Sequence, residues 1–288
     1  MTDIKTVTPA TTIFVLGGED GEMRAIRALL QRFGYRWVQP NQAWGDHAFT
    51  PAQCGLKVES KELSRQGHSY RADQIDGLHQ AVFVECRASE SGWPTDGWRS
   101  VVIDHHGSRS GEVASIQQVI DLLGLWPRLS SATQRWAELI AVNDSGWIPG
   151  LQAWGATLEE IERVRGFDRA AQGITPVHET EVERALTAPE ELIGAIRIVR
   201  MSHSKTSPLG DRLALTAMRE GREAPSYLAL SGDGEVNFSG DGALAAALAT
   251  RFQGWSGGSG LGKAGEKAFW GGYPSHEEVL AFIREHTA

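Results

Sequence analysis

Short apolar runs rich in β-branched residues punctuate the first half of the chain and are bounded by turn-forming residues. The runs at 13–16, 81–84 and 101–103 are too short for helices, so each predicts a buried strand. Apolar residues at helical spacing follow the first run and stop near Gly34, which predicts a helix there. Strands that alternate with helices in this way predict an α/β fold built around a parallel sheet.

Further helices are predicted later in this half of the chain. Apolar periodicity indicates helices over 116–123 and 131–142, and the second of these brings Asp144 to its end, where a turn is expected to hold it. Thr157 and Glu160 have the spacing of a capping box at the start of another helix.

A second, smaller α/β unit is predicted in the last third of the chain. The alternating run 196–201 indicates a strand, and further strands near 227–230 and 236–238 precede a helix over 241–252. A chain of 288 residues is long enough for two domains. We expect the break between Ala171 and Pro189 and assign a first domain to 1–188 and a second to 189–288.

Acidic residues stand where the apolar runs of the first domain end. Asp20 and Glu22 follow the first run, Glu85 the second, Asp104-His105-His106 the third, and Asp144 the run at 139–142. Carboxylates gathered at one edge of a sheet repel one another and need metal ions or cationic partners. Oxygen and imidazole ligands together suit Mn, Zn or Fe. Taken alone, the segment 101–107 is equally consistent with two structural histidines, one packed behind a site and the other simply buried.

These motifs, in this order, resemble the signature of the DHH phosphoesterase superfamily. That group has a His-x-x-x-Asp-x-Asp motif, a strand-end Asp, Asp-His-His and a later Asp. Asp20-Gly21-Glu22, Glu85, Asp104-His105-His106 and Asp144 occupy the corresponding places, and the resemblance covers about residues 12–170. It implies a metal-dependent phosphoesterase whose active site lies in the cleft between two domains.

The resemblance also implies particular site residues. Metal candidates are Asp20, Glu22, Glu85, His105 and Asp144, and catalytic candidates are Asp104, His105 and His106. The implied cofactor is Mn²⁺, as one or two ions, with Mg²⁺ as an alternative. A metal-activated water would attack phosphorus, with His106 hydrogen-bonded to the phosphoryl oxygens.

The sequence departs from the family at the first motif. Leu16 stands where the family has a histidine, and it removes a nitrogen ligand from one of the two metal positions. The position built from Glu22, Glu85, His105 and Asp144 stays complete in donor type. His47 is the first candidate to replace the missing histidine.

Substrate contacts are expected mainly from the second domain. The hydroxyl-rich segment 202–207 contains His203 and Lys205 and suits phosphate or ribose, although a hydrophilic linker explains it equally well. The glycine-rich segment 254–263 contains Ser259 and Lys263, at a place where many DHH proteins have a substrate-binding glycine loop. Its likeness to a P-loop is rejected, because Ala264 replaces the Mg²⁺-binding hydroxyl. Arg169 in the first domain faces either a phosphate or a surface acid.

Charge and composition limit the partners. A net charge of −8 argues against a long nucleic-acid track, which leaves a short nucleotide or another small phosphate ester as substrate. Cys54 and Cys86 give no disulfide framework and suit a reducing cytoplasm. The start of the chain lacks a signal-peptide pattern and no apolar run reaches the length of a membrane span, so no membrane partner is expected. The oligomeric state stays open, a homodimer included.

Two other functions remain open at this point. Leu16 favours a catalytically weakened descendant that binds a nucleotide and acts as a sensor or regulatory protein. A pyrophosphatase is the other alternative, and it would need more Lys and Arg in the second domain to clamp a far smaller substrate.

Overall fold

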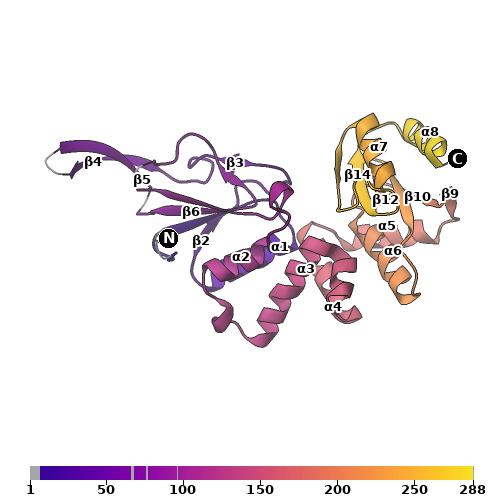
Figure 1. The fold of residues 1–288 in the computed structure, drawn as a ribbon, viewed down its shortest axis with the longest axis horizontal. Coiled ribbons are helices and arrows are strands. Elements are labelled where there is room, and N and C mark those ends of the chain that lie inside the picture. Colours follow the sequence, from indigo (N-terminus) through magenta and orange to yellow (C-terminus); the bar gives the residue numbers. More distant parts are fainter. Residues whose placement is uncertain (1–6, 66–67, 76, 96, 288) are drawn as a thin grey trace. The chain divides into compact units, whose positions relative to one another are not determined.

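The computed structural model describes residues 7–65, 68–75, 77–95 and 97–287, which form two compact units, Met1–Gln172 and Gly173–Ala288 (Figure 1). The boundary falls inside the interval 171–189 but ahead of the one assigned at 188/189. Helix α5 (Pro176–Thr187), which the assignment gave to the first domain, belongs to the second unit, where Val182 is buried against Val199 and Leu213. Both units mix helices with sheets, so the α/β class is confirmed.

A four-stranded parallel sheet forms the centre of the first unit. Its order is β2 (Arg36–Val38), β1 (Thr12–Leu16), β6 (Gln80–Val84) and β8 (Arg99–Ile103). β1 and β6 are buried along their whole length, as expected for parallel strands covered on both faces. Each strand runs in the same direction, so their carboxyl ends lie at one edge of the sheet.

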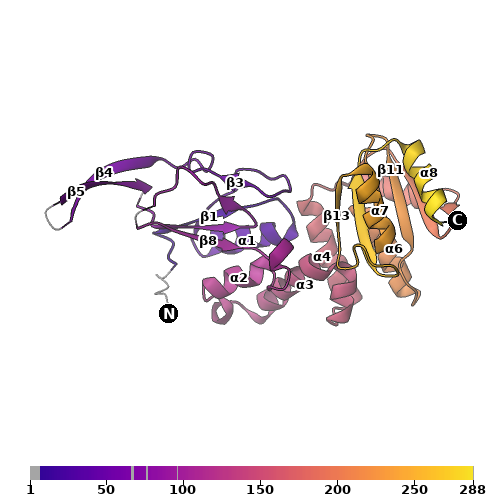
Figure 2. The same ribbon diagram turned by 45° about the horizontal axis from the view of Figure 1, so that its top comes forward.

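Helices cover one face of this sheet, and loops with short strands cover the other (Figures 1 and 2). The helices are α1 (Gly21–Arg32), α2 (Ser115–Leu122), α3 (Ser131–Ala153) and α4 (Leu158–Ala171). The opposite face carries a core cluster that includes Ile13, Val15, Phe49 and Phe83. The remaining elements are β3 (Ala48–Phe49), β4 (Val58–Arg65), β5 (His68–Ile75), β7 (Arg87–Ala88) and the 3₁₀ turns Gly107–Arg109 and Trp126–Arg128.

Helix α3 continues past the end predicted for it at residue 142. It stays regular through Asp144 and is interrupted at Trp147, whose φ of 50° and ψ of −150° are not helical. Pro149 explains the interruption, because its ring clashes with the carbonyl of Ser145 and it has no N–H to donate. Asp144 therefore projects from a helix, and the expected turn begins after it.

The second unit is a six-stranded sheet between two pairs of helices. Its order is β13 (Trp255–Gly257), β14 (Lys267–Gly272), β12 (Val236–Asp241), β11 (Ser226–Ser231), β10 (Ile196–Met201) and β9 (Glu191–Ile193). α5 and α6 (Ser207–Arg219) cover one face, and α7 (Gly242–Phe252) and α8 (His276–Thr287) cover the other. The strand predicted at 196–201 is confirmed at those bounds.

The cysteines and the lengths of the helices complete the description of the fold. Cys54 and Cys86 are both buried free thiols, and the Cys86 thiol lies 3.3 Å from the carbonyl oxygen of Val15, which accepts its hydrogen bond. None of the helices that the structure describes is long and apolar enough to cross a membrane.

Candidate metal centre and active site

The strand register brings the sequence motifs of the first unit together. Leu16 pairs with Val84, and Val84 pairs with Ile103, so the residues that follow each strand are neighbours at one sheet edge. The turn after β1 approaches Glu85 closely, because a Cβ on Gly17 would lie 2.6 Å from the Glu85 carbonyl oxygen. Only glycine fits at that position.

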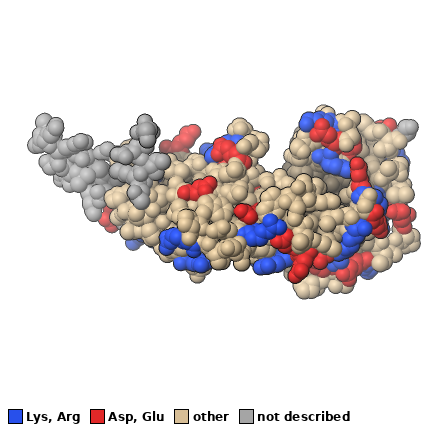
Figure 3. Space-filling model, turned by 60° about the horizontal axis from the view of Figure 1, so that its bottom comes forward, with Lys and Arg blue, Asp and Glu red and all other residues tan. Residues whose placement is uncertain are grey.

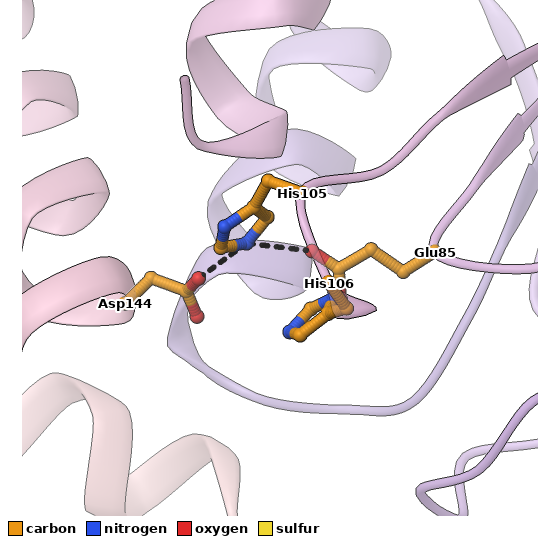
Figure 4. A group of neighbouring side chains, drawn as sticks. All are labelled: Glu85, His105, His106 and Asp144. Atoms are coloured by element: carbon orange, nitrogen blue, oxygen red, sulfur yellow. Dashed lines mark ion pairs between the residues drawn. The ribbon is translucent and has the colours of Figure 1, made fainter. Parts of the chain in front are cut away.

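The imidazole of His105 lies at the centre of a group of buried carboxylates. Its Nε2 atom is 2.7 Å from Asp144 Oδ2, 3.5 Å from Glu85 Oε1 and 3.7 Å from Glu22 Oε2. Figure 4 shows Asp144 and Glu85 reaching this nitrogen from opposite sides, one from a helix and the other from a strand end. Between 0% and 12% of each of these four side chains is exposed.

The same four atoms make ion pairs with one another but no well-aligned hydrogen bonds. Oε2 of Glu22, Oε1 of Glu85, Nε2 of His105 and Oδ2 of Asp144 are all buried without an aligned hydrogen-bond partner. Burying polar groups without good hydrogen bonds is costly, and four that converge on one point and contact mainly one another indicate a site for a ligand. One atom each from Glu85, His105, His106 and Asp144 also lie within 4.8 Å of one another. Three carboxylate oxygens and one imidazole nitrogen fit a divalent metal ion.

Burial changes the protonation of this group. It raises the pKa of Glu22 and of Asp144, and neighbouring carboxylates raise both further. Burial also raises the pKa of Asp20, with further contributions from Asp144 and Glu85. The Asp144 and Glu85 carboxylates raise the pKa of His105 to about 10. Without a metal, therefore, an imidazolium at His105 offsets the acids.

Backbone groups hold two of the carboxylates in place. The N–H of Ile116, in the first turn of α2, donates to Glu22 Oε1 at 3.0 Å and leaves the other oxygen facing His105. Glu85 has a φ of 52°, a left-handed conformation that is uncommon for any residue but glycine. Such strain is typical of functional positions, where the surrounding structure compensates for it.

Asp104 and His106 form a pair beside the buried group. Asp104 Oδ1 accepts from the backbone N–H of His106 and lies 2.9 Å from its Nδ1 atom. The His106 side chain is 49% exposed, whereas that of His105 is 7% exposed. Asp104 therefore orients His106 from one side and leaves its second ring nitrogen free to meet a ligand.

Asp20 caps α1 and lies close to the buried group without being one of its members. Its Oδ1 atom accepts from the Met23 N–H at 2.7 Å, and only 3% of the residue is exposed. The charges of Asp144 and Glu85 act on it, as its raised pKa shows. Its second carboxylate oxygen remains to bind an ion.

The missing nitrogen ligand is supplied neither by Leu16, which has no donor atom, nor by His47 as the structure places it. Leu16 is fully buried at the end of β1. His47 Nε2 lies 3.1 Å from the Ala43 carbonyl oxygen and 3.2 Å from Asn41 Nδ2, within its own loop. Among the described residues, the metal-candidate group does not include His47.

The proposed substrate residues belong to both units. Arg169 is half-buried on α4. In the second unit, His203 Nε2 lies 3.2 Å from Glu181 Oε2, and Lys205 is exposed nearby. Ser259 is exposed, and Lys263 Nζ lies 3.2 Å from Glu266 Oε2 in the same glycine-rich loop. Their role in binding substrate stays a prediction, as does a site shared between the two units.

Sequence reasoning missed a buried polar network that supports the site. Asp168 accepts from the Gly21 N–H at 2.9 Å and from Arg165 Nη1 at 2.7 Å. Arg165 also donates to Asn143 Oδ1 at 2.9 Å, next to Asp144. Their spacing in the sequence could have indicated that both side chains are buried, because Arg165 and Asp168 follow Ile161 at i+4 and i+7 and so lie on the same face of α4.

We expect removal of either central ligand to abolish tight metal binding. His105→Ala and Asp144→Asn should each lower the affinity for Mn²⁺ by at least about 100-fold, because even the loss of a residue that only supports a ligand lowers metal affinity about 10–100-fold. Isothermal titration measures this directly. His79→Ala is the matched control, because His79 is exposed and precedes β6 at the opposite edge of the sheet. Unchanged affinity in both ligand variants would rule out this site.

Metal affinity should rise with pH. Because the pKa of His105 is raised to about 10, the metal-free protein holds a proton on this ring throughout the neutral range, and a metal must displace it. Displacement of one proton gives roughly a tenfold gain in affinity per pH unit between about pH 6 and 9. Calorimetry in buffers of different ionisation enthalpy counts the protons released. An affinity that does not change with pH would show that His105 keeps its proton and is not a ligand.

Comparisons with known proteins do not identify the function of this chain. No protein-family model matches the chain, and no curated protein matches it. Among solved structures, a pGpG-specific phosphodiesterase from Vibrio cholerae is similar over 95% of this chain and 98% of its own, with a TM-score of 0.40 and 9% sequence identity. Similarity at that level carries no weight for function, which has to be inferred from the geometry of the site.

Proposed function

We propose that the protein is a metal-dependent phosphodiesterase of the DHH type that hydrolyses a short nucleotide. One observation carries the proposal: three buried carboxylate oxygens converge within 3.7 Å of His105 Nε2 at the carboxyl edge of a parallel sheet, with no well-aligned hydrogen bonds among them. Ligands of open α/β folds bind at that edge. The motif Asp104-His105-His106 supplies the second part of the support, through its resemblance to the DHH superfamily.

Glu22, Glu85, His105 and Asp144 would hold the ion, with Mn²⁺ as the proposed metal and Mg²⁺ as the alternative. A divalent ion would supply a nucleophile from water at neutral pH and offset charge on the phosphoryl oxygens. Asp20 would complete a second position, together with Glu85. These donors are mainly hard oxygen atoms, which suit such metals.

His106 would bind the phosphoryl group. Its ring lies against that of His105, with the ring centroids 4.4 Å apart, and lines a cavity beside the buried group. With Nδ1 hydrogen-bonded to Asp104, the Nε2 atom is available to a phosphoryl oxygen as donor when the ring is protonated. Asp104 acts through His106 as a positioning residue.

A short substrate fits the charge of the molecule. The net charge of −8 leaves no excess of basic residues for a continuous basic stripe, and on the face in Figure 3 Lys and Arg side chains lie among Asp and Glu side chains. A long nucleic acid would require such a stripe. Ser259, Lys263, His203 and Lys205 remain proposed contacts of the second unit to the far end of the substrate.

The alternative of a nucleotide-binding sensor rests on Leu16. A two-metal site holds both the attacking and the leaving oxygens, so losing a ligand at one position should harm chemistry more than ground-state binding. The pyrophosphatase alternative has less support. Among the described residues that line the cavity beside the centre, Arg87 is the one Lys or Arg, and it is paired with Asp46.

Hydrolysis of 5′-phosphorylated diribonucleotides with Mn²⁺ tests the proposed function. We expect turnover that chelators abolish, and a loss of about 100-fold in kcat for His106→Gln with a much smaller change in Mn²⁺ affinity. His79→Gln is the matched control and should retain full activity. If the metal-loaded protein hydrolyses no phosphodiester, the enzymatic proposal fails.

Leu16→His distinguishes the enzyme from the sensor. Restoring a nitrogen ligand should tighten the second ion and raise kcat by about tenfold or more, because that position then holds its ion at lower metal concentration. Elemental analysis and the rate as a function of Mn²⁺ concentration give the readout. If the natural protein already holds two tight ions and the variant changes neither occupancy nor rate, another residue supplies the ligand. If both proteins bind nucleotide and neither hydrolyses it, the sensor function is correct.

A further inference from the structure

A cavity of about 510 Å³ opens beside the candidate metal centre, wholly within the first unit. Its lining includes the site residues Glu85, Asp104 and His106, together with Trp44, Asp46 and Arg87. Its volume is that of a small-molecule binding site. A phosphate at His106 would therefore leave space in the same cavity for a further group of the substrate.

Trp44 is one of the residues that line this cavity. The residue is 59% exposed, the largest exposed fraction of the tryptophans among the exposed large hydrophobic residues. Trp and Tyr carry apolar area on a rigid ring, which suits them to binding planar ligands. An indole that forms a wall of the cavity containing the catalytic candidates is thus placed to contact substrate.

The loop around Trp44 is held against the turn that follows β1. The Glu19 N–H donates to the Gln42 carbonyl at 3.0 Å, and the Ala43 N–H donates to Asn41 Oδ1 at 2.9 Å. A Cβ on Gly18 would lie 3.3 Å from the Ala43 carbonyl oxygen, so the two segments pack closely. The backbone that leads into Trp44 is therefore held by hydrogen bonds, which reduces the entropy lost when a ligand binds.

A charged pair adds hydrogen-bonding groups to the lining of the same cavity. Arg87 Nε lies 3.0 Å from Asp46 Oδ1, and Arg87 Nη2 lies 3.4 Å from Oδ2. The side chains are 52% and 78% exposed, so both retain donors and acceptors for a ligand. An aromatic face beside mixed donors and acceptors matches a nucleobase, which has a π-face and polar edges. An aliphatic ester would gain little from either feature.

We propose that Trp44 stacks on a nucleobase of the substrate, with the Arg87–Asp46 pair beside the edge of that base. This site makes the protein selective for nucleotides over other phosphate esters. The assignment rests on the proposed function for the identity of the reacting group, whereas the base contact itself is a binding property that can be measured without turnover.

Binding of AMP and of ribose 5-phosphate in the presence of Mn²⁺ tests this assignment, because the two ligands differ by the base. Calorimetry should show AMP binding about tenfold more weakly to Trp44→Ala than to the natural protein, with Trp44→Phe retaining most of the affinity. Ribose 5-phosphate should bind all three proteins equally. Trp154→Ala is the matched control, since Trp154 is also exposed but ends α3 and contacts Arg135.

Three results would overturn the assignment: AMP binding to the natural protein no tighter than ribose 5-phosphate, an unchanged AMP affinity in Trp44→Ala, or an equal loss for both ligands. The same proteins assayed with a diribonucleotide separate this inference from the proposed function. A base-selective loss of binding in a protein that hydrolyses nothing supports the nucleobase site and rejects the enzyme. Hydrolysis that Trp44→Ala leaves unaltered, together with unselective binding, rejects the nucleobase site and supports the enzyme.

Discussion

The close approach of buried carboxylates to one imidazole is the constraint on which the first unit depends. Glu22, Glu85 and Asp144 all face His105 Nε2 from within 3.7 Å, and their side chains are at most 12% exposed. Like charges this close oppose folding unless a cation compensates for them. The proton on His105 compensates part of this charge. A divalent ion would compensate more of it and would also bind the oxygen atoms that lack well-aligned hydrogen bonds.

The surrounding structure keeps these acids together against their repulsion. Parallel register aligns the strand ends, the Ile116 N–H holds Glu22, and Glu85 adopts a left-handed backbone conformation. On the helical side, Asp168 joins the start of α1 to Arg165. A buried ion pair of this kind contributes little net stability, but loss of one partner is costly, which fits a role in fixing geometry.

The strand ends of the first unit could be predicted from sequence because apolar runs, turns and acids are all local signals. Glu85 and His105 were found in this way. The helical position of Asp144 was not predicted, because the turn formers at 143–149 indicate a break directly after residue 142, whereas the helix is interrupted only at Trp147. The support from Asp168 depends on packing between α1 and α4, which a single sequence does not show. The boundary assigned from the sequence lies 16 residues after the one in the structure. The apolar side chains of α5, such as Val182, show that the helix covers a sheet but not which of the two sheets it covers.

Anomalous scattering from crystals grown with Mn²⁺ tests the central claim most directly, because it locates the ion and its ligands together. The account predicts a peak bonded to His105 Nε2 and to carboxylate oxygens of Glu22, Glu85 and Asp144, with bond lengths of about 2.0–2.3 Å. A well-ordered first unit without such a peak, its His105 still paired with carboxylates in saturating Mn²⁺, would contradict it.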